Sequence, residues 1–555
     1  MTDMRRTLLW VVFTMSLVLL WDAWNKHNGQ PSLFGPSSRP VAASAAPASG
    51  TLPEATPGTP AAAAAGTPPV VAAAASAATP TVTVSTDVLK LTLDARGGDV
   101  VRAELLTQID QNDRTRNVVL FDRSKDHVYL AQTGLIGAPD LPTHLTALQL
   151  QPGETALAAG RDALSVVFES PEQGGVKLRK TLTLERGSYA VDVKHEVVNT
   201  STAPVSPVLY LQLVRDASVE GHSSFLSAPQ SFTGPVVYTD ASKFQKVDFK
   251  AIEKGNADYN KSADNGWVAM VQHYFFSAWL HNDKAPREFY TLRHTDFGLP
   301  VYAVGEKLPL GEIAPGTSKS IDSVLFIGPQ EEKKLEALAP GLELVKDYGW
   351  FTIIAKPLFW LLDQLHKLIG NWGWAIVALV VLLKAAFYWL NAKAYSSMAK
   401  MKAINPKITE MRERLKDKPQ QMQQEMMRIY KEEKVNPLGG CLPILVQMPV
   451  FIALYWVLLS SVEMRNAPWL GWITDLSVKD PLFILPLVMT GTTMLQTWLN
   501  PTPPDPMQAK MMWIMPLMFS VMFFVFPAGL VLYWITNNLL SIVQQWVINR
   551  RLGVN

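Results

Sequence analysis

The segment WGWAIVALVVLLKAAFYWL, residues 372–390, decides the fold class of this 555-residue chain. Its nineteen residues carry one formal charge, Lys384, and their length is close to the ~20 residues that a membrane-spanning helix needs. Four further apolar spans follow, and all five are predicted transmembrane helices: 441–461, 482–499, 512–526 and 529–547. Span 512–526 is short for a hydrocarbon core of about 30 Å, which indicates a thinned bilayer or a protein-lined site.

The N-terminal part of the chain predicts a sixth transmembrane helix followed by a tether. Residues 8–24 are apolar, and bulky Trp21 and Trp24 stand where a signal peptidase requires small residues. We therefore expect residues 1–24 to form an uncleaved signal anchor with a cytoplasmic N-terminus. Residues 25–80, rich in Ala and Pro, are expected to be disordered, because they bury too little apolar area to offset the entropy of ordering.

Residues 81–339 alternate polar and apolar side chains between turn signals, which predicts one large antiparallel β domain on the periplasmic side. One predicted hairpin has the apolar set Leu178, Leu182, Leu184, the turn Arg186-Gly187-Ser188, and then Tyr189, Val191 and Val193. The single cysteine, Cys441, excludes an intrachain disulfide, so the core alone must hold this domain.

Residues 340–371 are predicted to be a connector and an amphipathic helix lying in the membrane interface. After Pro357, which suits a helix start, the apolar side chains of one face are Leu358, Leu361, Leu362, Leu365, Leu368 and Ile369. Asp363, Gln364 and Lys367 fall on the opposite face. An ordinary surface helix of the β domain is the alternative, but the span that follows directly favours the interface.

A polar region, residues 391–435, separates the first two of the five spans and is predicted to be a helical hairpin. It holds eleven Lys or Arg against six Asp or Glu, a net charge of +5, so the positive-inside rule places it in the cytoplasm with both chain termini. Methionines on this side offer deformable contacts for a substrate or partner, or simply pack the hairpin: Met398, Met401, Met426, Met427 and Met511.

Lys384 is the charge that needs an explanation inside the membrane. An ionisable residue there costs roughly 2.5–3.5 kcal/mol on insertion scales, so it requires water, a partner or an escape route. Snorkelling to the cytoplasmic end is one reading, and a water-filled cavity open to the cytoplasm is the favoured one. Asn537, Ser541 and Gln544 share one face of the last span, with Asn538 and Gln545 beside it, and Gln447 lies on another span. Each alone is more often an interhelical hydrogen bond, but together with Lys384 they can line such a groove.

Several function classes lack their signatures. The near-neutral net charge of +2 argues against nucleic-acid sequence recognition, and neither a P-loop nor a dinucleotide-binding glycine motif is present. His195-Glu196 lacks the second histidine of a zinc protease motif, so no metal, cofactor or enzyme activity is predicted. A transporter and an anchored carbohydrate-processing β domain remain as alternatives, without the internal repeats or paired carboxylates that would favour them.

The sequence resembles the YidC/Oxa/Alb family of membrane insertases. The resemblance runs through GNWG (370–373), YSSMAKM (395–401), KVNPLGGC (434–441), QMP (447–449) and GLVLYW (529–534). It implies a bacterial inner-membrane insertase and folding chaperone of six transmembrane helices with a periplasmic β-supersandwich. It also implies a hydrophilic groove, open to cytoplasm and lipid, in which Lys384 meets incoming chains and Tyr533 and Trp534 contact substrate.

The resemblance also implies partners. These are nascent, small or weakly hydrophobic membrane proteins, the Sec translocon with its accessory subunits, membrane lipid, and the ribosome. The family commonly has Arg at the position of Lys384, and Lys keeps the charge without the bidentate fork. Because only four residues follow Arg551, ribosome docking is expected to use the cytoplasmic loops.

Overall fold

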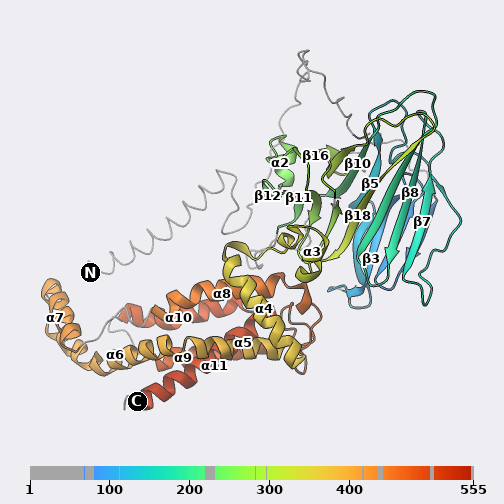
Figure 1. The fold of residues 1–555 in the computed structure, drawn as a ribbon. Coiled ribbons are helices and arrows are strands. Elements are labelled where there is room, and N and C mark those ends of the chain that lie inside the picture. Colours follow the sequence, from blue (N-terminus) through green and yellow to red (C-terminus); the bar gives the residue numbers. More distant parts are fainter. Residues whose placement is uncertain are drawn as a thin grey trace. The chain divides into compact units, whose positions relative to one another are not determined.

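A computed structural model describes Pro68 and residues 80–111, 113–218, 232–281, 283–294, 297–415, 418–433, 442–500 and 506–551. The predicted anchor, residues 1–24, lies outside the described residues, as does the tether 25–80 except for Pro68 and Pro80. The β domain and the helical region that follows are therefore the parts whose structure can be compared with expectation (Figure 1).

Within the described residues the β domain consists of two nine-stranded antiparallel sheets. The first has the order β1 (Thr81–Ser85), β2 (Leu89–Asp94), β3 (Asp99–Ile109), β4 (Asn117–Arg123), β5 (Val128–Ile136), β10 (Val208–Asp216), β17 (Val301–Pro309), β16 (Arg287–His294) and β13 (Ser262–Ala263). The second has the order β12 (Lys243–Lys246), β11 (Gly234–Thr239), β14 (Trp267–Val271), β15 (Phe275–Leu280), β18 (Ser318–Pro329), β9 (Ala190–Asn199), β8 (Val176–Glu185), β7 (Ala163–Glu169) and β6 (Gln149–Leu150). Apolar side chains of both sheets share one core, which confirms the predicted antiparallel β domain as a sandwich.

The predicted hairpin shows why these sequences become strands. Leu182 of β8 pairs with Val193 of β9, and Leu184 pairs with Val191, so the alternating apolar residues share one face. All four side chains are buried in the core, and each contributes roughly 1.5–3 kcal/mol through its burial. Gly187 closes the turn with φ +71°, a left-handed conformation that glycine adopts without a steric cost.

The helical region follows the sandwich. Its elements are α3 (Glu332–Leu338), α4 (Thr352–Ile369), α5 (Trp372–Ala386), α6 (Tyr388–Arg414), α7 (Pro419–Glu432), α8 (Leu442–Ser460), α9 (Ile484–Leu499), α10 (Pro506–Met522) and α11 (Ala528–Arg551), with 3₁₀ turns at Leu342–Val345, Gly349–Phe351 and Val462–Met464. Side chains of α4, α5, α8, α9 and α11 form a second apolar core, separate from that of the sandwich.

The predicted span 372–390 is divided between two helices, because the chain bends by 69° between α5 and α6. Phe387, with φ −90° and ψ 10°, caps α5 and begins the change of direction. Just beyond it, the carbonyl of Tyr388 accepts a hydrogen bond of 3.3 Å from Nε2 of Gln544 on α11. A side chain that binds backbone at a bend is one of the known causes of a kinked helix.

A single helix that crosses a membrane must be both long enough and apolar enough. In the part of the chain that the structure describes, no single helix meets both requirements, whereas α5 and α6 meet them as a bent pair. Two shorter apolar helical segments are Gln447–Ser460 and Ala509–Met522. The number of spans remains a prediction from the sequence.

Helix α4 begins earlier than predicted and ends, as predicted, at Ile369. It begins at Thr352, so Pro357 lies inside the helix rather than at its start. Leu358 and Leu362 of the predicted apolar face are buried in the helical core, whereas Leu368 of the same face is 84% exposed. The sequence correctly placed apolar residues on a helix, whereas packing against neighbouring helices, which sequence does not show, decided which of them are covered. The interfacial position remains a prediction.

Helices α6 and α7 form the expected hairpin. Ile404, Ile408 and Met411 of α6 are buried against a set of partly buried side chains: Met401, Leu415, Met422, Met426, Ile429 and Tyr430. The first arm is longer than predicted, because α6 continues without interruption from the bend at Phe387 into the hairpin.

Candidate functional site

A polar network around Lys384 joins α5 to α11. The Nζ atom donates a 2.7 Å hydrogen bond to Oγ of Ser541, and Lys384 is only 9% exposed. The Ser541 hydroxyl has one proton, which it donates to the carbonyl of Asn537 at 2.7 Å. Its oxygen therefore serves Lys384 purely as an acceptor. Lys384 keeps two further N–H donors that this bond does not use.

The network extends from α11 to α8. Gln447 of α8 donates from Nε2 to Oδ1 of Asn537 at 2.9 Å. The structure thus brings together four of the predicted groove residues, Lys384, Ser541, Asn537 and Gln447, although α5 and α11 are 157 residues apart at the Lys384–Ser541 bond. Asn537 and Ser541 share a face of α11 because they are four residues apart.

The bend changes the electrostatic setting of Lys384. Since α5 ends at Ala386, Lys384 lies in the last turn of a helix rather than in the middle of a longer one. The carbonyl end of a helix carries partial negative charge, which stabilises a cation there by roughly 0.3–1 kcal/mol. Among the described residues, Lys384 has no carboxylate within ion-pair distance, so the helix end and the Ser541 hydroxyl are its favourable neighbours.

A second polar group on α11 faces α9. Asn538 donates from Nδ2 to Oγ1 of Thr493 at 3.0 Å and to Oγ1 of Thr492 at 3.3 Å. Gln545 donates to the carbonyl of Leu499 at 3.2 Å. Adjacent residues on a helix are about 100° apart, so Asn537 and Asn538 reach different neighbours. Asn538 and Gln545 therefore bond α9 and the residues that end it, whereas Asn537 and Ser541 belong to the Lys384 network.

The two predicted substrate-contacting aromatics pack within the helical core one turn before this network. Tyr533 is 3% exposed, and its ring stacks on Phe451 with centroids 6.0 Å apart. Trp534 meets Phe451 edge to face at 4.6 Å and lies 5.2 Å from Phe523. Because Tyr533 precedes Asn537 by four residues, both lie on the same side of α11.

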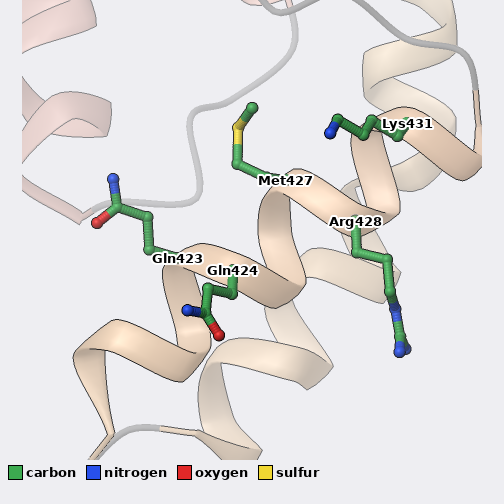
Figure 2. A pocket seen from close by; sticks show the side chains of 5 residues that line it. All are labelled: Gln423, Gln424, Met427, Arg428 and Lys431. Carbon is green, nitrogen blue, oxygen red and sulfur yellow. The ribbon is translucent and has the colours of Figure 1, made fainter.

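The predicted methionine contacts divide by exposure. Met401 and Met426 pack within the hairpin and Met398 is half-buried, whereas Met427 and Met511 are exposed. Met427 lines a shallow cavity of about 370 Å³, and Figure 2 shows that all of its lining residues come from α7: Gln423, Gln424, Met427, Arg428 and Lys431. Two of the five side chains are basic.

No group of three or more His, Cys, Asp or Glu residues in the described ranges is arranged to hold a metal ion. His195 of β9 is fully buried, and its Nε2 lies 3.0 Å from Oγ1 of Thr133 on β5. This hydrogen bond crosses from one sheet of the sandwich to the other.

Comparison with known proteins explains the two parts of the chain. A family model described as the YidC periplasmic domain matches residues 81–361, and one described as the 60Kd inner membrane protein matches residues 364–554. The chain belongs to the YidC family. This confirms the resemblance seen in the sequence, and it makes the chain an inner-membrane protein of bacterial type with a periplasmic β domain.

Relatives match the chain along almost its whole length. The membrane protein insertase YidC of Cupriavidus taiwanensis is 56% identical over 559 residues, covering 99% of this chain and 98% of that protein. The membrane protein insertase YidC of Janthinobacterium sp. (strain Marseille) is 50% identical over 573 residues, covering all of both. A crystal structure of an active YidC insertase aligns with 18% identity and a TM-score of 0.38, over 85% of this chain and 94% of that one.

Proposed function

We propose that this chain inserts membrane proteins into the inner membrane and assists their folding through a hydrophilic groove built around Lys384. The groove is open to the cytoplasm and to lipid. Its polar wall consists of Lys384, Ser541, Asn537 and Gln447. The observation that carries the proposal is the Lys384–Ser541 bond, in which a buried ammonium is held by a neutral hydroxyl rather than by a carboxylate.

The groove lowers the free-energy cost of bringing a polar segment of an incoming chain into the bilayer. Moving a charged residue to the centre of a bilayer costs roughly 2.5–3.5 kcal/mol. An ammonium with unused donors attracts an acidic or polar segment and lowers that cost while the segment crosses. A carboxylate already paired to Lys384 would compete with the incoming membrane protein, the client. The neutral Ser541 partner therefore favours transient contacts between Lys384 and the client.

Tyr533 and Trp534 are proposed to contact the apolar part of the same client. They lie one turn from Asn537 on α11, so a segment at Lys384 passes close to them. Both rings are engaged with Phe451, and a client would exchange that packing for its own. Aromatic surfaces suit many clients because their packing does not depend on one sequence.

The cytoplasmic side is proposed to receive the nascent chain from the ribosome or to cooperate with the Sec translocon and its accessory subunits. Exposed Met427 and Met511 offer deformable apolar contacts, and Arg428 and Lys431 add positive charge on α7. We propose Met398, Met401 and Met426 as the packed support of this surface. Both termini are proposed to be cytoplasmic.

Photocross-linking tests the groove. Photoreactive residues at Val380, Lys384, Tyr533 and Trp534 are combined with stalled, ribosome-bound nascent membrane proteins in native vesicles. Adducts are expected at 384 and 533. Matched controls are Trp498, 68% exposed, and Leu517, 54% exposed, whose side chains point away from the core.

The result that contradicts the proposal is labelling of the nascent chain at 498 and 517 with none at 384 or 533. In that case the client passes along the outer surface of the helices. The polar network would then be a structural link between helices.

A further inference from the structure

The loop between α8 and α9 carries an apolar tip on a rigid base. Leu470 is 58% exposed and Trp472 is 39% exposed, with Gly471 between them at φ +58°. The turn is closed by Trp469 N–H to the carbonyl of Ile473 at 3.0 Å and Ile473 N–H to the carbonyl of Leu470 at 3.2 Å. The exposed side chains therefore project from an ordered turn.

The base of the tip is fixed to α5. The Trp469 ring lies so close to Gly373 that a Cβ there would come within 2.2 Å of Trp469 Cδ1. Asn371, which caps α5, also donates from Nδ2 to the carbonyl of Pro468 at 3.1 Å. These contacts hold the tip beside the N-terminal end of α5 and leave Leu470 and Trp472 uncovered.

Trp472 is arranged as an amphipathic anchor. Its Nε1 donates to Oδ1 of Asp480 at 3.0 Å, and Asp480 is 1% exposed. The same carboxylate accepts the backbone N–H groups of Leu482 and Leu485 at the start of α9. The indole N–H is thus satisfied by protein, and the apolar part of the ring can enter lipid without leaving a donor unpaired.

The exposed apolar side chains of the tip are followed by others at the start of α9. Leu482 is 56% exposed and Phe483 38%, and the exposed face continues along α9 through Leu487 and Val488. Lys479 lies over the Phe483 ring at 5.9 Å. Exposed aliphatic and aromatic side chains next to a basic residue at a helix end are typical of the membrane–water interface.

We infer that the Leu470–Gly471–Trp472 tip is a lipid anchor that enters the periplasmic leaflet at the boundary between headgroups and acyl chains. The leaflet follows from a contact of this loop with the periplasmic domain, in which Nε2 of Gln111 donates to Oγ of Ser477 at 2.9 Å. The anchor holds the loop at the bilayer surface. The Gln111–Ser477 hydrogen bond links the loop to the β domain, so the anchor also restrains the position of that domain. The inference does not depend on the groove around Lys384.

Site-specific fluorescence tests the anchor in the full-length protein. Cys441 is replaced by Ser, Leu470 by Cys, and the thiol is labelled with the environment-sensitive dye NBD. The protein is reconstituted in vesicles of phosphatidylethanolamine and phosphatidylglycerol. Leu487→Cys on α9 is the lipid-facing control, and Lys125→Cys in the β domain is the aqueous control.

At position 470 we expect blue-shifted emission, strong quenching by a lipid nitroxide at a shallow acyl carbon, and loss of quenching by aqueous iodide. Iodide quenching equal to that at position 125 would overturn the inference, because the tip would then be in water. Shielding from both quenchers would overturn it too, because the tip would then be covered by protein.

Discussion

At the scale of single residues, Lys384 is a buried cation that bonds the Ser541 hydroxyl and has no counter-ion among the residues that the structure describes. The hydroxyl donates to its own helix and accepts from the ammonium, so each polar atom of the pair has a defined role. Position in the last turn of α5 adds the favourable end of the helix dipole. We propose that the charge remains available to a third group.

Ser541→Ala removes the hydroxyl acceptor of Lys384. A hydrogen bond to a charged group contributes about 1.5–3 kcal/mol, so we expect a clear loss of thermal stability in detergent. The matched control is Thr490→Ala, because the Thr490 hydroxyl bonds only the Pro486 carbonyl of its own helix at 2.8 Å. Equal melting temperatures for the two variants would show that the Lys384–Ser541 bond contributes no more to stability than the bond of Thr490 within its own helix.

At the scale of elements, two buried histidines contact strand residues of the β domain, and we expect them to make it sensitive to acid. Desolvation lowers the pKa of His144 to about 3, with help from the positive charges of Arg96 and Lys180 and from His294. Its Nδ1 lies 2.6 Å from the Tyr210 hydroxyl on β10. Desolvation also lowers the pKa of His195, which bonds Thr133 across the sandwich.

The direction in which pH changes the stability of the fold depends on whether the folded or the unfolded state binds more protons. Between a pKa of about 6.5 in the unfolded chain and about 3 in the fold, only the unfolded state protonates His144. Stability is therefore lost as pH falls below about 6.5, by roughly 1.4 kcal/mol per pH unit for each such histidine. His144→Asn should flatten this slope even where it lowers stability at pH 7.

Hydrogen exchange of β5 and β10 in the full-length protein measures that slope. Protection should decline from pH 7 to pH 5 in the natural sequence and decline less in His144→Asn. An identical decline in both proteins would assign the acid sensitivity to other groups.

Elements also show what the sequence could predict. The β8–β9 hairpin was predictable because Leu182 and Leu184 alternate locally with polar residues and a glycine turn follows. The bend at Phe387 was not, because Gln544, which binds the carbonyl beyond it, is 156 residues away in sequence from Tyr388. The start of α4 was misplaced since Pro357 suits a first turn, and nothing local shows that the helix begins earlier.

In the candidate site, too, the features that depend on local sequence were predictable and the contacts between distant residues were not. The shared face of Asn537 and Ser541 follows from their spacing on one helix. Their partners, Lys384 and Gln447, lie on other helices. The sequence therefore identified the four residues by their polarity, but it could not show which of them form hydrogen bonds with each other. Tyr533 was selected through the family resemblance, and its packing against Phe451 depends on a contact between α8 and α11.

At the scale of the whole molecule, one buried ion pair joins the connector before α4 to the loop after α8. Lys346 has a fully buried side chain, and its Nζ lies 3.0 Å from both carboxylate oxygens of Glu463. Nζ also lies 3.8 Å from the centre of the Phe359 ring. The neighbouring Val462 is buried with the core of the β domain, so the pair sits where the two parts of the chain meet.

Glu463→Gln leaves the Lys346 ammonium buried without its counter-ion. Breaking a buried pair costs about 3–5 kcal/mol, and we expect the lower end because Glu463 is partly exposed. Lys346→Met in the same background should recover most of the loss in a thermal melt. Lys334→Gln is the control, since its pair with Glu331 is exposed and contributes about 0–1 kcal/mol. Similar losses in Glu463→Gln and Lys334→Gln would contradict this assignment.

Water access to position 384 distinguishes a hydrophilic groove from a dry, protein-lined site. Lys384→Cys in a Cys441→Ser background is treated with a membrane-impermeant charged thiol reagent in oriented membrane vesicles. We predict modification when the cytoplasmic face is exposed to the reagent and none when only the periplasmic face is exposed. A cysteine that stays unmodified from both faces would contradict the hydrophilic groove, because the site of the ammonium would then be dry.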